Sequence, residues 1–165
     1  MILAELLDNN NALVRTSLEL IEESLKEHDV EAMVKDVVKT QEPHELTKGM
    51  FIAVKTLMFA MRETYSFPTL CNFLYSDAEE LALKGRDVST DYKVVNLLVS
   101  MEEDGGSFYL QVHSLPNPVQ TVTCLIKMFK RLSFLYYQEN PDFDALKAIP
   151  FFSEELNKYS RDKTQ

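Results

Sequence analysis

The sequence predicts a mainly α-helical fold, an irregular bundle around a buried central helix at about residues 44–63, with a β-hairpin near residues 92–113. Three observations support this prediction. Only 4 of the 165 residues are glycine, which disfavours a loop-rich β fold. Apolar residues recur at helical spacing in most segments. Residues 46–61 are apolar around nearly the whole circumference of a helix, and such a helix must be covered by other elements.

Length and charge limit the class of protein. A chain of 165 residues fits one domain that buries about 70% of its unfolded surface, so we expect a single domain over residues 1–165, with a polar tail that frays from about residue 160. The net charge of −9 disfavours direct binding to nucleic acid or to an anionic membrane, because phosphates are repelled. The N-terminal MILAELLDNN lacks the basic start of a secretory signal, and we therefore expect a cytoplasmic protein.

The first helices are indicated by N-cap residues. The run from Asp8 to Asn11 precedes an amphipathic helix at about residues 12–27, and Asp29 is placed to cap a shorter helix that ends near residue 39. Pro43 suits the first turn of the central helix, which the segment around Pro68 ends.

Two short helices are predicted next. Residues 70–75 are apolar, and residues 76–79 match a capping box followed by Gly85 at the position of a C′ glycine. These signals predict separate helices over residues 70–75 and 77–84.

The segment from residue 92 to residue 113 has two possible structures. Its first part is rich in Val and Leu, residues 104–106 form a DGG turn signal, and residues 108–113 alternate between apolar and polar. We favour a β-hairpin packed against the helices. The competing interpretation is a helix over residues 90–103, because Val94, Leu98 and Met101 also keep helical spacing.

The last long helix is predicted from the Asn117-Pro118 pair, an N-cap followed by proline at the first helical position. It runs to about residue 138 and ends before Pro141. Short helical pieces are expected on either side of Pro150.

The sequence contains no recognisable catalytic, metal-binding or nucleotide-binding motif. The three histidines have no metal-site spacing, and Cys71 and Cys124 lie in apolar segments that favour reduced core thiols. We therefore expect no catalytic residues, no cofactor and no metal.

Charge and aromatic residues suggest a surface for a protein partner. Residues 1–47 carry 11 acids against 4 bases, whereas residues 105–138 contain no acid. Phe108 and Tyr109 are predicted as aromatic anchors at the hairpin tip, and Lys127, Lys130 and Arg131 are predicted to steer association. The competing interpretation is that these bases merely face the protein's own acidic helices.

The function that we expect is a small acidic intracellular protein–protein interaction module that is not an enzyme and acts as an adaptor, assembly chaperone or inhibitor. One alternative is a small enzyme with a pocket near Cys71, His44 or His113. Another is an acidic nucleic-acid mimic, whose carboxylates in residues 19–45 occlude a DNA- or RNA-binding surface.

Overall fold

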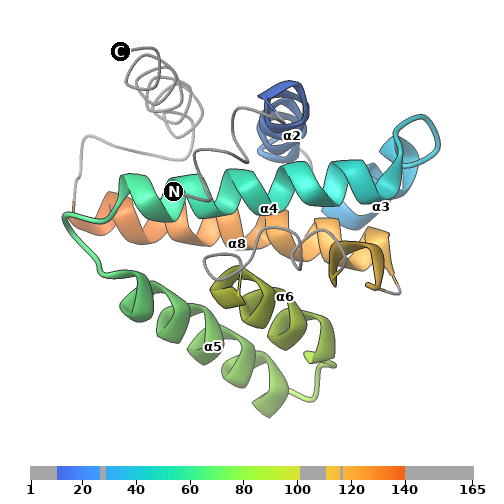
Figure 1. Ribbon diagram of the computed structural model, residues 1–165. Coiled ribbons are helices and arrows are strands. Elements are labelled where there is room, and N and C mark those ends of the chain that lie inside the picture. Colours follow the sequence, from blue (N-terminus) through green and yellow to red (C-terminus); the bar gives the residue numbers. More distant parts are fainter. Residues whose placement is uncertain (1–10, 27–28, 101–110, 116, 140–165) are drawn as a thin grey trace, which may run out of the picture.

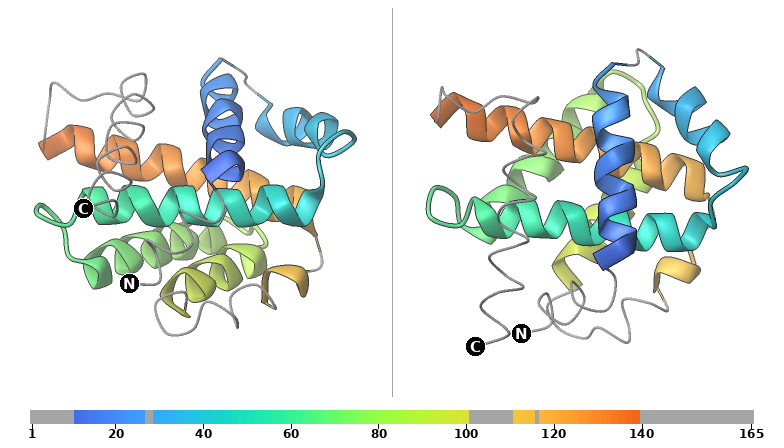
Figure 2. Two further views of the ribbon diagram at one scale, coloured as in Figure 1. Left: turned by 45° about the horizontal axis from the view of Figure 1, so that its top comes forward. Right: turned by 90° about the horizontal axis from the view of Figure 1, so that it is seen from above.

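The computed structural model describes residues 11–26, 29–100, 111–115 and 117–139. The described residues form helices and no strand, so the predicted mainly α class is confirmed. The helices are α2 (Asn11–Ser24), α3 (Val30–Val37), α4 (Pro43–Ala60), α5 (Phe67–Leu83), α6 (Ser89–Ser100) and α8 (Pro118–Glu139). Helices α4 and α8 lie side by side, α2 crosses over both, and α5 and α6 lie on the opposite side from α2 (Figures 1 and 2).

Helix α4 is the centre of the bundle, as its apolar circumference predicted. It packs most extensively against α8 and α2, and most of its residues from Leu46 to Met58 are buried. Even Lys55 is only 3% exposed, with its ammonium group 3.2 Å from the centroid of the Phe67 ring, a cation–π contact that suits a buried amine.

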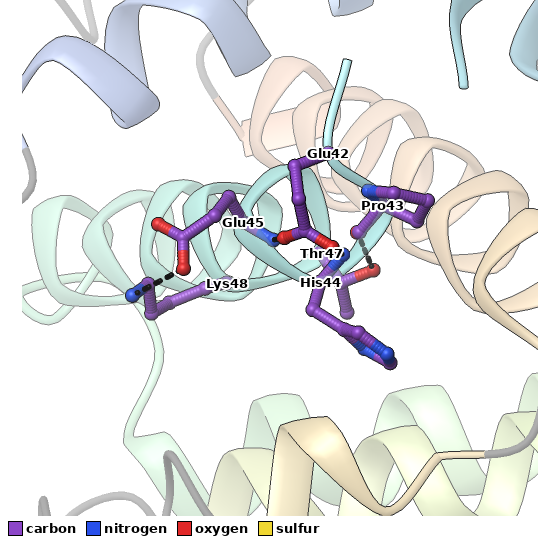
Figure 3. A network of polar contacts seen from close by, with 6 residues as sticks. All are labelled: Glu42, Pro43, His44, Glu45, Thr47 and Lys48. Atoms are coloured by element: carbon purple, nitrogen blue, oxygen red, sulfur yellow. Dashed lines mark hydrogen bonds and ion pairs between the residues drawn. The ribbon is translucent and has the colours of Figure 1, made fainter. Parts of the chain in front are cut away.

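The start of α4 is held by the N-cap side chain and by a side chain one turn into the helix (Figure 3). The Glu42 carboxylate accepts hydrogen bonds from the backbone N–H of His44, at 3.2 Å, and of Glu45, at 2.7 Å. The Thr47 hydroxyl donates to the Pro43 carbonyl at 2.8 Å. The two bonds to Glu42 satisfy N–H donors that a helix start leaves open, and Pro43 has no N–H to satisfy.

Helices α2 and α4 cross at close range over Gly49. A Cβ atom at Gly49 would lie 2.6 Å from Ser17 Oγ and 2.7 Å from the Leu13 carbonyl oxygen. Only glycine lets the two backbones approach this closely.

The predicted β-hairpin near residues 92–113 is wrong. Residues 89–100 form α6, and residues 111–113 form a helical turn in which Val112 is buried. The buried residues of α6, Val94, Val95, Leu97 and Leu98, recur at helical spacing, and the helix packs against α5 and α8. Tertiary packing therefore overrides the β propensity of valine. The DGG turn, Phe108 and Tyr109 lie outside the described residues.

Helix α5 replaces the two short helices that the capping box predicted. It begins after Ser66, whose hydroxyl accepts from the Thr69 N–H at 3.2 Å, and it continues through Ser76 without a break. Leu70, Leu74 and Ala78 are buried at intervals of four residues, so one apolar face extends across the predicted boundary. The predicted C′ position of Gly85 is confirmed by its φ of 81°.

Other start signals are confirmed by hydrogen bonds. Asp29 caps α3 by accepting from the Ala32 N–H at 3.1 Å, and Asn117 caps α8 by accepting from the Gln120 N–H at 3.1 Å. Apart from Ala78, the buried apolar residues of the described helices form one connected cluster. Among these helices, none is both long enough and apolar enough to cross a bilayer.

Candidate functional site

The three basic residues predicted to steer a partner lie in different surroundings on α8. Lys127 and Arg131 are exposed and share one face of the helix. Lys130 is half-buried, and its ammonium group donates to the Ser24 carbonyl oxygen of α2 at 3.2 Å. Lys130 therefore joins α8 to α2, while Lys127 and Arg131 are exposed at the surface.

A groove of about 290 Å³ lies between α5 and α8 beside Lys127 and Arg131. We call it the α5–α8 groove, and it is lined by Leu74, Asp77, Ala78, Glu80, Leu81, Lys84, Asp91, Cys124, Lys127, Met128 and Arg131. Buried or half-buried apolar side chains form its floor, namely Leu74, Ala78, Leu81 and Met128. Charged side chains of both signs surround this floor.

One end of the α5–α8 groove is formed by an ion pair between its two long helices. Arg131 Nε on α8 lies 2.9 Å from Asp77 Oδ2 on α5, and Arg131 Nη2 lies 3.5 Å from Asp77 Oδ1. The guanidinium carbon is 4.9 Å from the Phe73 ring centroid and 5.8 Å from that of Phe134. The Phe134 side chain is 49% exposed, so an aromatic ring and a guanidinium group are presented together.

A second cavity, of about 230 Å³, continues the groove toward α3. It shares Leu81, Asp91, Cys124 and Lys127 with the first, and it adds Glu31 of α3 and Thr90 of α6. The depression therefore follows α8 over several turns, a shape that fits an extended or helical segment better than a compact small molecule.

The cysteine in the groove is a poor nucleophile. Burial is the main cause that raises the pKa of the Cys124 thiol far above its ordinary value, and the neighbouring Asp91 carboxylate raises it further. Cys124 Sγ donates to Asp91 Oδ1 at 3.4 Å, which also favours the protonated thiol, while Lys127 opposes these effects only in part. Because the thiolate is the reactive form, Cys124 contributes packing and a weak hydrogen bond rather than nucleophilic catalysis.

The residues named for an enzyme site do not gather in the groove. Cys71 is buried on α5. His44 and His113 are brought together, with ring centroids 4.9 Å apart, but neither lines the α5–α8 groove or its continuation. Among the described residues, no group of three or more His, Cys, Asp or Glu side chains is placed to hold a metal ion.

Sequence reasoning missed the groove residues of α5 and the role of Phe134. The capping-box pattern predicts Asp77 at a helix start, whereas Asp77 lies inside α5 and pairs with Arg131 of α8. The only local signal was the spacing of Arg131 and Phe134, three residues apart on one helix face.

No protein-family model, curated protein or solved structure matches this chain.

Proposed function

We propose that this chain is a non-enzymatic protein–protein interaction module that binds a segment of a partner protein in the α5–α8 groove. The observation that supports it best is an apolar groove lined at one end by Arg131, with the exposed Phe134 ring adjoining that arginine just outside the groove. Aromatic and arginine side chains are the residue types that most often dominate the binding energy of protein interfaces. An adaptor, an assembly chaperone and an inhibitor would all use such a surface. The proposal also includes a cytoplasmic location.

The composition of the groove resembles the usual organisation of an interface. Apolar side chains form the centre and charged side chains the periphery, so a partner gains burial in the middle and orientation at the edge. Met128, which is 7% exposed, adds a polarisable thioether to the floor of the groove. These features favour an amphipathic helix or short peptide with one apolar face.

The charges around the groove change the role that the sequence suggested for the basic residues. Lys127 and Arg131 lie beside the acids Asp77, Glu80 and Asp91, so the periphery carries both signs. We therefore propose that the charges mainly set the orientation of the partner and that Lys127 adds a modest, salt-dependent contribution to the rate of association.

The alternative functions gain less support from the described residues. A nucleic-acid mimic needs acids that are not neutralised, yet Glu31, Asp36 and Glu45 each pair with a lysine on the same helix or at its end, at 3.5, 3.4 and 3.1 Å. A cysteine enzyme needs a thiolate, and Cys124 is held as a thiol.

Affinity capture with a matched pair of variants tests the proposal. Phe134→Ala removes a 49% exposed ring 5.8 Å from the guanidinium carbon of Arg131, which lines the groove, whereas Leu83→Ala removes an 88% exposed side chain of α5 that does not line the groove. We expect proteins captured from cells of the source organism by the wild type and by Leu83→Ala to be depleted with Phe134→Ala, as measured by quantitative mass spectrometry. Equal capture by all three proteins would exclude Phe134 and its end of the groove as the binding site.

A further inference from the structure

Two histidines from separate parts of the chain meet at the start of α4. His44 lies in the first turn of α4, and its ring points away from the helix axis (Figure 3). His113 belongs to the helical turn at residues 111–113. The ring centroids are 4.9 Å apart and the ring planes are inclined by 50°. His113 is exposed and His44 is half-buried, so dissolved ions can reach the pair.

The separation of the rings suits two imidazoles that share one metal ion. An ion bonded to an imidazole nitrogen at about 2.0–2.1 Å lies roughly 3.2 Å from the centroid of that ring. Two such rings have centroids roughly 4.5 Å apart when the two bonds form a right angle, and roughly 5.2 Å apart at a tetrahedral angle. The observed 4.9 Å lies between these two values.

We propose that His44 and His113 form a two-histidine site for a borderline divalent cation such as Zn²⁺, with water in the remaining coordination positions. Imidazole nitrogen is a preferred ligand of Zn²⁺, Ni²⁺ and Cu²⁺. The described part of the chain supplies two ligands rather than a closed set of four, so the site is of the open type and binds reversibly. A bound ion would tie the turn at residues 111–113 to the start of α4.

Two nearby charges have opposite effects on the binding of a cation between His44 and His113. The positive end of the α4 helix dipole disfavours it. The Glu42 carboxylate, fixed by its bonds to the N–H groups of His44 and Glu45, counters this effect and interacts electrostatically with both histidines. A negative charge held next to the pair therefore offsets the cost of placing an ion at a helix start.

Zinc titration of histidine variants tests the site, with the third histidine of the chain as the matched control. Isothermal titration calorimetry with ZnCl₂ would be run near neutral pH on tag-free protein for the wild type, His44→Ala, His113→Ala, His113→Gln and His28→Ala. We expect the wild type and His28→Ala to bind Zn²⁺ alike. Each change at His44 or His113 should weaken binding by at least about tenfold, because loss of even an outer-shell partner costs that much.

Thermal unfolding gives a second readout. Zn²⁺ should raise the melting temperature of the wild type and of His28→Ala, and EDTA should reverse the shift, because a ligand that binds only the folded state stabilises it. His113 is exposed, so the His113→Gln variant, which keeps a polar side chain, should remain folded. Circular dichroism checks this, so that a loss of Zn²⁺ binding is not mistaken for a loss of folding. Absent binding by the wild type, or equal binding by all five proteins, would overturn the proposal.

Discussion

Arg131 on α8 and Asp77 on α5 form an ion pair, with Arg131 Nε 2.9 Å from Asp77 Oδ2, at one end of the groove. The two side chains are 45% and 28% exposed, so water screens the attraction between them. The pair positions the guanidinium group between Phe73 and Phe134, and its main effect is therefore on the shape of the binding surface.

A double-mutant cycle of Arg131→Ala and Asp77→Ala measures this pair. We expect a coupling energy of no more than about 1 kcal/mol in urea unfolding, because exposed ion pairs contribute little to stability. Arg131→Ala should still weaken partner binding more than Asp77→Ala does. A coupling of several kcal/mol would mean that the pair is a structural clamp between α5 and α8.

Lys127 and Lys130 should respond differently to the same substitution. Lys130→Ser removes the bond to the Ser24 carbonyl and should lower the free energy of unfolding by about 1 kcal/mol, with partner association unchanged. Lys127→Ser should change stability by less than about 0.5 kcal/mol and slow association, more strongly at low salt. Chemical denaturation and stopped-flow binding on both variants provide the comparison. The reverse pattern would show that Lys130, rather than Lys127, faces the partner.

Gly49→Ala tests the close crossing of α2 over α4. An exposed glycine-to-alanine change in a helix usually stabilises it, but the added methyl group here would meet Ser17 Oγ and the Leu13 carbonyl oxygen. We expect a loss of about 1–3 kcal/mol in denaturant unfolding. Adding Ser17→Ala should recover only part of this loss, since the backbone oxygen of Leu13 remains. A stabilised Gly49→Ala variant would place α2 farther from α4.

The raised pKa of Cys124 predicts a loss of stability at alkaline pH. In the unfolded chain the thiol ionises near its ordinary pKa of 9.0, whereas burial and Asp91 keep it protonated in the folded protein. The folded state then binds the proton more tightly, so its stability falls as pH rises above about 9. Melting temperatures at mildly and strongly alkaline pH should fall more steeply for the wild type than for Cys124→Ala. Parallel curves, or rapid labelling of native Cys124 by a thiol reagent, would contradict the buried thiol.

Local chemistry was enough to predict the starts of α3, α4 and α8 and the end of α5. Asp29, Asn117 and Gly85 act through hydrogen bonds or backbone angles within four residues of themselves, and these interactions are readable from the sequence. The buried α4 was predictable for a similar reason, since an apolar residue on every side of a helix leaves no face for water.

Tertiary packing decided the features that local patterns leave open. The Val- and Leu-rich residues of α6 fit the periodicity of a strand and of a helix, and contact with α5 and α8 selected the helix. The capping-box pattern inside α5 was overridden because its apolar face continues across Ser76.

The candidate site depends on contacts between residues that are far apart in the sequence. The sequence determined that Lys127, Lys130 and Arg131 lie near one another on α8, but only the fold directs Lys130 to α2 and Arg131 to Asp77. The meeting of His44 and His113 is likewise a property of the folded chain. Such contacts join residues separated by many turns of helix, and no local spacing rule encodes them.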